Sequence, residues 1–187
     1  ELAHGWVAIR YGDNTPIYTG HMTWNPVVHM GVFSLIMFAL LGIAWGAMPV
    51  DPSRLRGRYA YAKVCVAGPV ANVLLAAICI VVHAITTKVV GLGPPSDIQL
   101  RVMTFFMMGA MLNVALAMFN LLPVYPLDGG RILANVVPSF GRLFESQGAM
   151  IASVIVFYVA MSSLGTVFFR AAASVAYWAS DSIVRLI

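Results

Sequence analysis

The first four residues of the chain carry two side chains that together could hydrolyse a peptide bond. The sequence opens Glu1-Leu2-Ala3-His4, and residues three apart on a helix share a face, so the carboxylate and the imidazole point the same way. The pattern matches the last four residues of H-E-x-x-H, in which two histidines one turn apart bind zinc and the glutamate is the general base. The position that would carry the first histidine precedes Glu1. Taken alone, the same four residues also fit an ordinary helix end with a capping histidine.

A carboxylate far along the chain could complete such a site. Asp128 lies in a Pro/Gly-rich break, residues 123–130, directly after an apolar stretch long enough to cross a membrane. An ionisable group at membrane depth is costly and by default functional. One oxygen ligand added to two histidines gives a catalytic zinc set that leaves a position for water. The alternative is that Asp128 caps the short helix that we expect over 131–137.

The composition predicts that lipid, rather than water, surrounds much of the protein. Of the 187 residues, 60% are hydrophobic and 10% are charged, whereas soluble domains carry about 25% charged residues. The long apolar runs favour helices over the alternating strands of a barrel. We therefore expect an all-α polytopic membrane protein that forms a single domain over residues 1–187. The net charge of +4 does not indicate nucleic-acid binding, because the cations cluster beside apolar segments.

The order of apolar and turn-rich segments predicts a helical bundle of about four to six membrane segments, with a short β-hairpin or re-entrant element after the first helix. The expected elements are the end of a helix over 1–12, a hairpin over 13–26, a re-entrant or membrane helix over 27–47, membrane helices over 60–90, 98–122 and 149–169, and an interfacial helix over 170–187.

Whether residues 27–47 cross the membrane or turn back decides whether the two motifs can meet. His4 and Asp128 must lie at one bilayer depth to share an ion. If the segment dips into the membrane and returns, both motifs approach the same face, and we therefore favour the re-entrant path. Gly31, Gly42, Gly46 and Pro49 make a broken path plausible.

The distribution of basic residues predicts the orientation in the membrane. The loop at 48–63 and the segment with Arg131 and Arg142 are separated by two expected spans, so they lie on one side. By the positive-inside rule that side is cytosolic. We expect an integral protein of the cell membrane, inner or plasma, with its active site nearer the cytosolic face.

Four stretches in the same order resemble one known family, the site-2 proteases, which are intramembrane zinc metalloproteases. They are E-L-A-H-G at the start, N-P-V-V-H at 25–29, A-G-P-V-A-N at 67–72 and F-N-L-L-P-V-Y-P-L-D-G-G-R at 119–131. The last stretch is the most specific, and the likeness covers nearly the whole chain. It is greatest for the compact subgroup without an inserted PDZ domain. The resemblance implies that this sequence begins within the H-E-x-x-H motif.

The resemblance also implies an activity, a cofactor and partners. The activity is hydrolysis of peptide bonds in or near transmembrane segments of protein substrates, with the lipid bilayer as solvent and Zn²⁺ as cofactor. Glu1 is then the catalytic base, and His4 and Asp128 are zinc ligands. The competing interpretation is an inactive pseudoprotease, or a transporter-like module, that only binds transmembrane partners. The sequence does not indicate an oligomeric state.

Two asparagines and the expected hairpin complete the set of candidate residues. By its family-like spacing from Asp128, Asn120 is a candidate donor to the substrate carbonyl or oxyanion, and the alternative is helix packing. For Asn72 we favour a hydrogen bond between helices, with contact to substrate as the second possibility. The hairpin edge at Ile17, Tyr18 and Thr19 could pair with an unwound substrate segment by strand addition.

Overall fold

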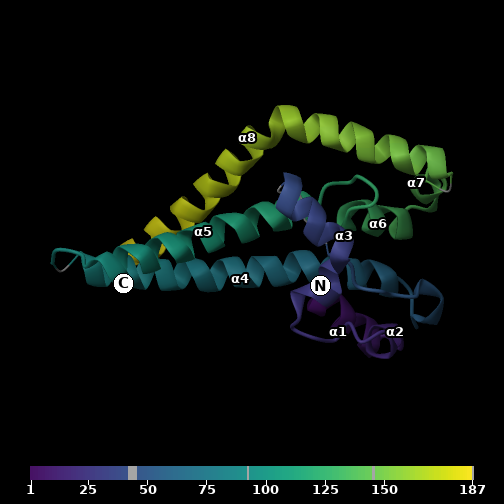
Figure 1. Ribbon diagram of the computed structural model, residues 1–187, viewed down its shortest axis with the longest axis horizontal. Helices are drawn as coiled ribbons and strands as arrows, with labels where there is room; N and C mark the ends of the chain where they lie inside the picture. Colours follow the sequence, from purple (N-terminus) through teal and green to yellow (C-terminus); the bar gives the residue numbers. More distant parts are fainter. Residues whose placement is uncertain (42–45, 92, 145, 187) are drawn as a thin grey trace.

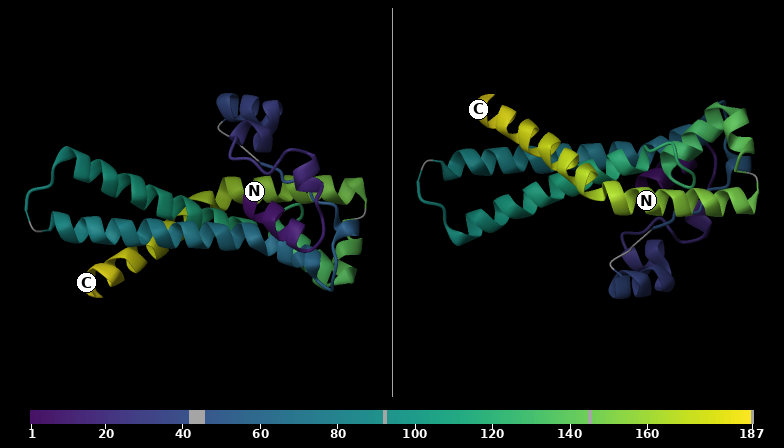
Figure 2. Two further views of the ribbon diagram at one scale, coloured as in Figure 1. Left: turned by 90° about the horizontal axis from the view of Figure 1, so that it is seen from below. Right: turned by 90° about the horizontal axis from the view of Figure 1, so that it is seen from above.

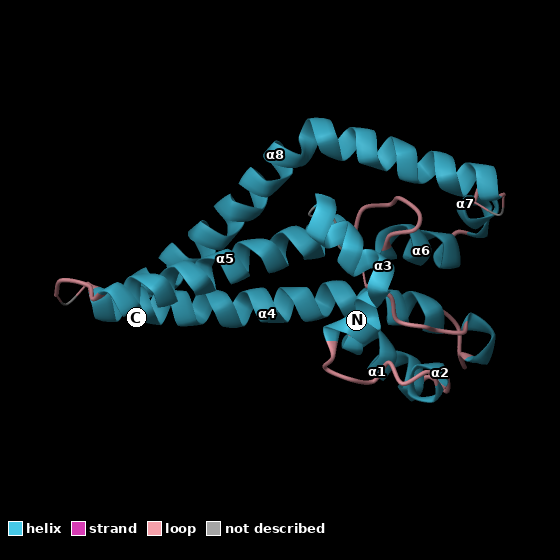
Figure 3. Ribbon diagram, in the orientation of Figure 1, coloured by secondary structure: helices cyan, strands magenta, loops and turns pink. Residues whose placement is uncertain are grey.

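The computed structural model describes residues 1–41, 46–91, 93–144 and 146–186, and over these it consists of helices joined by turns and loops (Figures 1 and 3). The elements are α1 (Leu2–Arg10), α2 (Thr15–Tyr18), α3 (Pro26–Leu41), the 3-10 turn η1 (Pro52–Arg54), α4 (Ala60–Val90), α5 (Asp97–Asn120), α6 (Asp128–Val136), α7 (Pro138–Arg142) and α8 (Gln147–Leu186). No strand occurs in the part of the chain that the structure describes. The prediction of an all-α protein is confirmed.

Helices α4 and α5 form a long antiparallel pair that is the stem of the molecule (Figure 1). Their bounds lie close to the membrane helices predicted over 60–90 and 98–122. The start of α5 is fixed by a capping box, in which the Ser96 side chain accepts from the Gln99 backbone and the Gln99 side chain accepts from the Ser96 backbone. Within the described residues, these are the two helices that are long and apolar enough to cross a membrane. The expected total of four to six segments remains a prediction.

Helix α8 occupies the region for which we expected a membrane helix over 149–169 and a separate interfacial helix over 170–187. The structure joins both in one bent helix of 40 residues (Figures 1 and 2). Within α8, the hydroxyls of Ser162 and Ser163 both donate to the carbonyl of Val159. Serine hydroxyls that bond back to the preceding turn bend helices, and so do Gly/Ser pairs.

The C-terminal half of α8 crosses the α4–α5 pair, and the hydrophobic core lies at this crossing (Figure 2). The core cluster consists of Ile80, Met107, Ala110 and Ala176, which are buried. The two alanines are fully buried and allow the helices to approach closely. Such small residues are common where helices meet in lipid, because the surrounding solvent gives no hydrophobic driving force for association.

The predicted β-hairpin over 13–26 is wrong. Residues Thr15–Tyr18 form the short helix α2, and the amide of Thr19 still donates to the carbonyl of Thr15. Pro16 explains the difference, because its fixed φ suits the first turn of a helix. The Asp13 side chain also accepts a hydrogen bond from the Thr15 amide, which starts a turn at this point. These local bonds outweigh the strand preference of the threonines and Ile17.

The path of residues 27–47 falls partly on 42–45, which lie outside the described residues. Helix α3 is interrupted at Gly31, whose backbone has φ 67° and ψ 163°. The ten residues that follow within α3 are about 15 Å long, half of what a membrane crossing requires. The amide of Ala47 donates to the carbonyl of His29 at 2.9 Å. The two ends of the segment therefore lie together, which supports the re-entrant path.

Different elements surround the two ends of the stem (Figures 1 and 2). The start of α4, the 51–59 loop and helices α1, α6 and α7 gather at one end, and the turn between α4 and α5 lies at the other. The basic loop and the segment with Arg131 and Arg142 are therefore on one side, as the charge pattern predicts.

Candidate metal centre

His4 is held against α4 by a hydrogen bond that orients its ring. Its Nδ1 lies 2.7 Å from the carbonyl oxygen of Val64, and a carbonyl accepts only, so Nδ1 carries the proton and Nε2 presents its lone pair. Gly68 lies one turn further along α4. A Cβ added to Gly68 would be 2.2 Å from His4 Nε2. The glycine therefore makes the space in which the imidazole lies.

Asp128 is the first residue of α6, and the loop before it folds tightly onto that helix. Gly129 and Gly130 are buried. A Cβ on Gly129 would lie 2.3 Å from the carbonyl oxygen of Leu121, and a Cβ on Gly130 would lie 2.5 Å from the carbonyl carbon of Val124. Only glycine fits at both positions, and the close approach fixes the direction in which Asp128 leaves the loop.

Helix α8 supports the same loop from its other side. The hydroxyl of Ser153 donates to the carbonyl of Tyr125 at 2.5 Å. The Tyr125 ring stacks on that of Phe144, with centroids 5.5 Å apart. The loop before Asp128 is therefore held by α6 and by α8.

The structure brings His4 and Asp128 together, although they are far apart in the sequence. His4 Nε2 lies 3.5 Å from Asp128 Oδ2, and both side chains are largely buried. The capping alternative for Asp128 is not what the structure shows, because the N-cap of α6 is Leu127 and no side chain caps the helix.

The pair fits two ligands of one zinc ion. Two ligand atoms at about 2.0–2.2 Å from a tetrahedral zinc lie about 3.3–3.6 Å apart, and the distance from His4 Nε2 to Asp128 Oδ2 is 3.5 Å. A zinc-ligating histidine commonly donates its other ring N–H to a carbonyl, as His4 does to Val64. Over the described residues, no third His, Cys, Asp or Glu joins the pair.

Glu1 lies beside the non-helical segment 46–50, next to the N-terminal end of α1. A Cβ on Gly46 would be 2.9 Å from Glu1 Oε1, and a Cβ on Gly5 would be 3.0 Å from the sulfur of Met48. The segment therefore follows α1 from Glu1 to Gly5. Glu1 itself is exposed at the end of the helix.

The two candidate asparagines lie on the helices that surround this pair. Asn72 is on α4, one turn after Gly68 and on the same face. Asn120 is the last residue of α5, immediately before the loop that leads to Asp128. Both side chains are partly buried. Their roles remain predictions.

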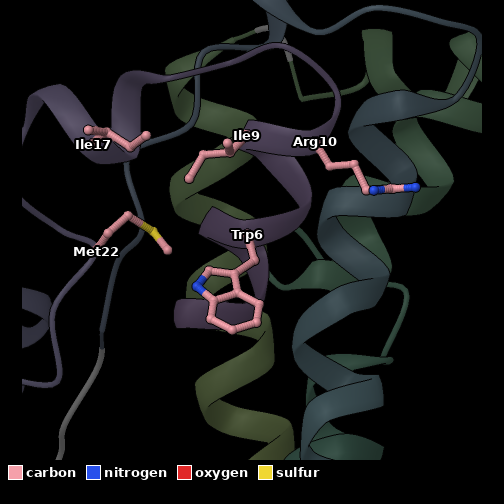
Figure 4. Close-up of a pocket in the computed structure, with 5 residues that line it drawn as sticks. All are labelled: Trp6, Ile9, Arg10, Ile17 and Met22. Carbon is pink, nitrogen blue, oxygen red and sulfur yellow. The ribbon is translucent and has the colours of Figure 1, made fainter.

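The three candidate substrate residues of the expected hairpin lie elsewhere. Ile17 and Tyr18 are in α2 and Thr19 ends it, so their backbone groups form helical hydrogen bonds and offer no strand edge. Ile17 lines a surface hollow of about 580 Å³ together with residues of α1 and Met22 (Figure 4). Trp6 of this hollow is roughly 200° around α1 from His4. The hollow is therefore separate from the metal centre.

Sequence reasoning missed the Val64 carbonyl and the contact between Gly46 and Glu1, because Gly46 was considered only as a break in the path of residues 27–47. A backbone carbonyl has no side chain that a motif could record, and Gly46 lies far from the motif in sequence. The sequence offers Gly68 only as part of the family-like stretch 67–72, whereas in the structure it accommodates the His4 ring. The signal that could have revealed this is the position of Val64 and Gly68 one turn apart on α4.

Comparison with known proteins agrees with this geometry. Residues 88–163 match the profile of Peptidase family M50. The chain is 33% identical over 173 residues to "Putative zinc metalloprotease YwhC" of Bacillus subtilis (strain 168). The aligned region covers 89% of this chain and 76% of the relative. No solved structure matches. The predicted resemblance is confirmed: the chain belongs to Peptidase family M50, the site-2 protease family, and is a metallopeptidase.

Proposed function

We propose that the protein is a zinc endopeptidase that cleaves transmembrane segments of other proteins within the bilayer. The observation that supports this most directly is the 3.5 Å approach of His4 Nε2 and Asp128 Oδ2. Gly68, which makes room for the pair, is eight residues into the apolar helix α4, or about 12 Å from its start. The pair is thus attached to a helix long enough to cross a membrane, and residues 1–187 form one membrane-embedded core.

The proposed ligands and base follow from the arrangement of α1, α4 and α6. His4 and Asp128 would hold the zinc, and the H-E-x-x-H pattern places a further ligand at the position before Glu1. Zinc supplies Lewis acidity that polarises the scissile carbonyl and lowers the pKa of water to about 7. Glu1 takes the proton from water and delivers it to the leaving amine. Asn120 donates a hydrogen bond to the substrate carbonyl.

A substrate helix must unwind before its amide reaches Glu1, and the enzyme needs a segment that holds the unwound chain. Ile17 and Tyr18 lie in α2 and Thr19 ends it, so these three residues present no strand edge to a substrate. The non-helical segment 46–50 follows α1 from Glu1 and is the better candidate for pairing by strand addition. For Asn72, on the face of Gly68, the role that we propose is a hydrogen bond between helices.

The distribution of cations supports a cytosolic position of this end of the stem. Arg54, Arg56 and Arg58 are exposed beside the start of α4, and Arg142 lies at the same end. Basic residues near the ends of membrane helices favour the cytosolic side. We therefore place the metal centre nearer the cytosolic face of the cell membrane.

Two substitutions test the proposal in the protein that carries its natural residue before Glu1. The readouts are bound zinc and cleavage of a transmembrane substrate in detergent micelles. Glu1→Gln keeps the shape of the side chain but removes the base, so zinc content should stay and cleavage should be lost. Asp128→Asn removes a charged ligand and should weaken both.

Asp181→Asn is the matched control, because Asp181 pairs with Arg185 on the surface of α8. This variant should resemble the wild type in both measurements. Cleavage by the Glu1→Gln variant at the wild-type rate would refute the proposed role of Glu1 and, with it, the proposed function.

A further inference from the structure

Asp13 is a fully buried carboxylate that lies outside the metal centre and joins two distant parts of the chain. Its side chain has 0% exposure. One oxygen, Oδ1, accepts from the Thr15 amide at 2.9 Å and from the Thr15 hydroxyl at 2.5 Å. The other, Oδ2, accepts from the Asp51 amide at 2.7 Å. The carboxylate thus connects the end of α1 to the segment that leads into α4.

A second hydrogen bond joins the same two regions. The amide of Arg56 donates to the carbonyl of Tyr11 at 2.8 Å. The ammonium of Lys63, in the first turn of α4, lies 5.0 Å from the centroid of the Tyr11 ring. The end of α1 is therefore attached to the 51–59 loop by a buried ionic hydrogen bond and a backbone bond, and to the first turn of α4 by a cation–π contact.

This attachment matters because α1 is short. A helix of nine residues is not stable alone, so its position depends on what holds its two ends. The N-terminal end is held by the bond from His4 to the Val64 carbonyl. The C-terminal end is held by Asp13 and Tyr11. One end thus depends on α4 and the other mainly on the loop that leads into it, so a shift at Asp13 is expected to change the position of the whole helix, His4 included.

We propose that Asp13 is a positioning residue of the metal centre, which sets where α1 places Glu1 and His4 against α4 and α6. The proposal rests on the zinc peptidase function above. Asp13 itself takes no part in the reaction. It acts by fixing the far end of the helix that carries both groups.

Substitution of Asp13 by asparagine is the sharpest test. Asparagine has the same shape, but its amide end would face one of the three donors that the carboxylate accepts. Residues that bond directly to a metal ligand change metal affinity by about tenfold to a hundredfold. Asp13 acts through the helix, so we expect a loss of zinc affinity at the lower end, about tenfold, and a lower kcat with little change in KM. Zinc affinity is measured by competition with a chelator, and kinetics at a temperature well below the melting point of the variant.

A second pair of variants keeps the test decisive if Asp13→Asn does not fold. Thr15→Val removes the hydroxyl bond to Asp13 and leaves the amide bond. Ser53→Ala removes a similar hydroxyl bond of 2.6 Å, which goes to the Asp51 side chain and stays within its own loop. We expect a measurable loss of zinc affinity and kcat for Thr15→Val and wild-type values for Ser53→Ala.

The outcomes separate this inference from the proposed function. If Asp13→Asn or Thr15→Val lowers the melting temperature but leaves zinc affinity and kcat unchanged, the contact is merely structural and the inference is overturned. If the wild type binds zinc but cleaves no substrate, the proposed function fails, while the zinc affinity of the Asp13 variants still decides the role of this residue.

Discussion

The two ends of the stem are stabilised in different ways. At the end with the metal centre, hydrogen bonds join segments far apart in the sequence, as from His4 to Val64 and from Asp51 to Asp13. At the other end, α4, α5 and α8 pack mainly through apolar residues such as Met107 and Ala176. Apolar packing brings helices together but tolerates small shifts, whereas directed bonds fix the positions of individual atoms. The difference indicates that atoms must be positioned more accurately at the end with the metal centre than at the other end.

A polar contact inside the distal half differs from those near the metal. His83 Nδ1 lies 2.8 Å from the hydroxyl of Ser180, which joins α4 to α8. Ser180 is buried. The contact links two helices that already pack along their length, so we expect it to add stability rather than to set a position.

The largest effect on zinc binding and cleavage is expected when a glycine beside the metal centre is replaced by alanine. Gly68→Ala places a Cβ 2.2 Å from His4 Nε2 and 3.2 Å from Asp128 Oδ2. The imidazole must move, and a displacement of about 1 Å at a catalytic centre costs about a hundredfold in rate. We expect loss of zinc and of cleavage, measured by metal analysis and by the substrate assay.

Gly109→Ala is the matched control in the distal half. Its Cβ would lie 3.1 Å from the sulfur of Cys79 and 3.9 Å from the Cβ of the same residue, and a thiol side chain can rotate. Alanine also favours the helical state by about 1 kcal/mol relative to glycine. Zinc content and cleavage should stay near wild type. Equal damage by both substitutions would contradict the distinction between the two ends.

Lowering the pH should have a smaller effect, which is a loss of folding stability through protonation of the buried carboxylate of Asp13. Burial raises the pKa of Asp13, but the hydrogen bonds from Thr15 and from the Asp51 amide outweigh it, so the net pKa lies below its usual value. The ionised group therefore stabilises the folded state above the unfolded pKa of about 4, and this contribution is lost as the pH falls through the lowered pKa.

The measurement is the melting temperature in detergent between about pH 6 and pH 3. The wild type should be more stable than Asp13→Asn at the upper end, and the gap should close as the pH falls. A gap that stays constant over this interval would show that the charge of Asp13 does not contribute.

The smallest effect is expected in the distal half. Ser180→Ala removes the hydroxyl that contacts His83. Hydrogen bonds between membrane helices contribute about 0.6 kcal/mol on average. We expect a slightly lower melting temperature and unchanged kcat. A loss of activity comparable with that of Gly68→Ala would mean that the two ends are coupled through α4.

Long elements and charged motifs could be predicted from the sequence, because both leave strong local signals. The apolar runs gave the bounds of α4 and α5 to within about two residues, and Glu1, His4 and Asp128 were selected by motif. Local bonds were harder to foresee: the proline and Asp13 favour a helical turn at Thr15–Tyr18, within the segment where a hairpin was expected. Asp13 was overlooked because a buried carboxylate in a polar loop resembles any turn residue.

The length of α4 has a consequence for the choice of the bond that is cut. Its 31 residues measure about 46 Å, whereas the hydrocarbon layer is about 30 Å thick. The helix must tilt or project, and either response changes with membrane thickness. His4 is hydrogen-bonded to α4 near the start of that helix. The depth of His4 in the membrane therefore changes when α4 tilts or projects. Lipids with longer chains should therefore move the scissile position along the substrate, by about one residue for each 1.5 Å of helix that shifts.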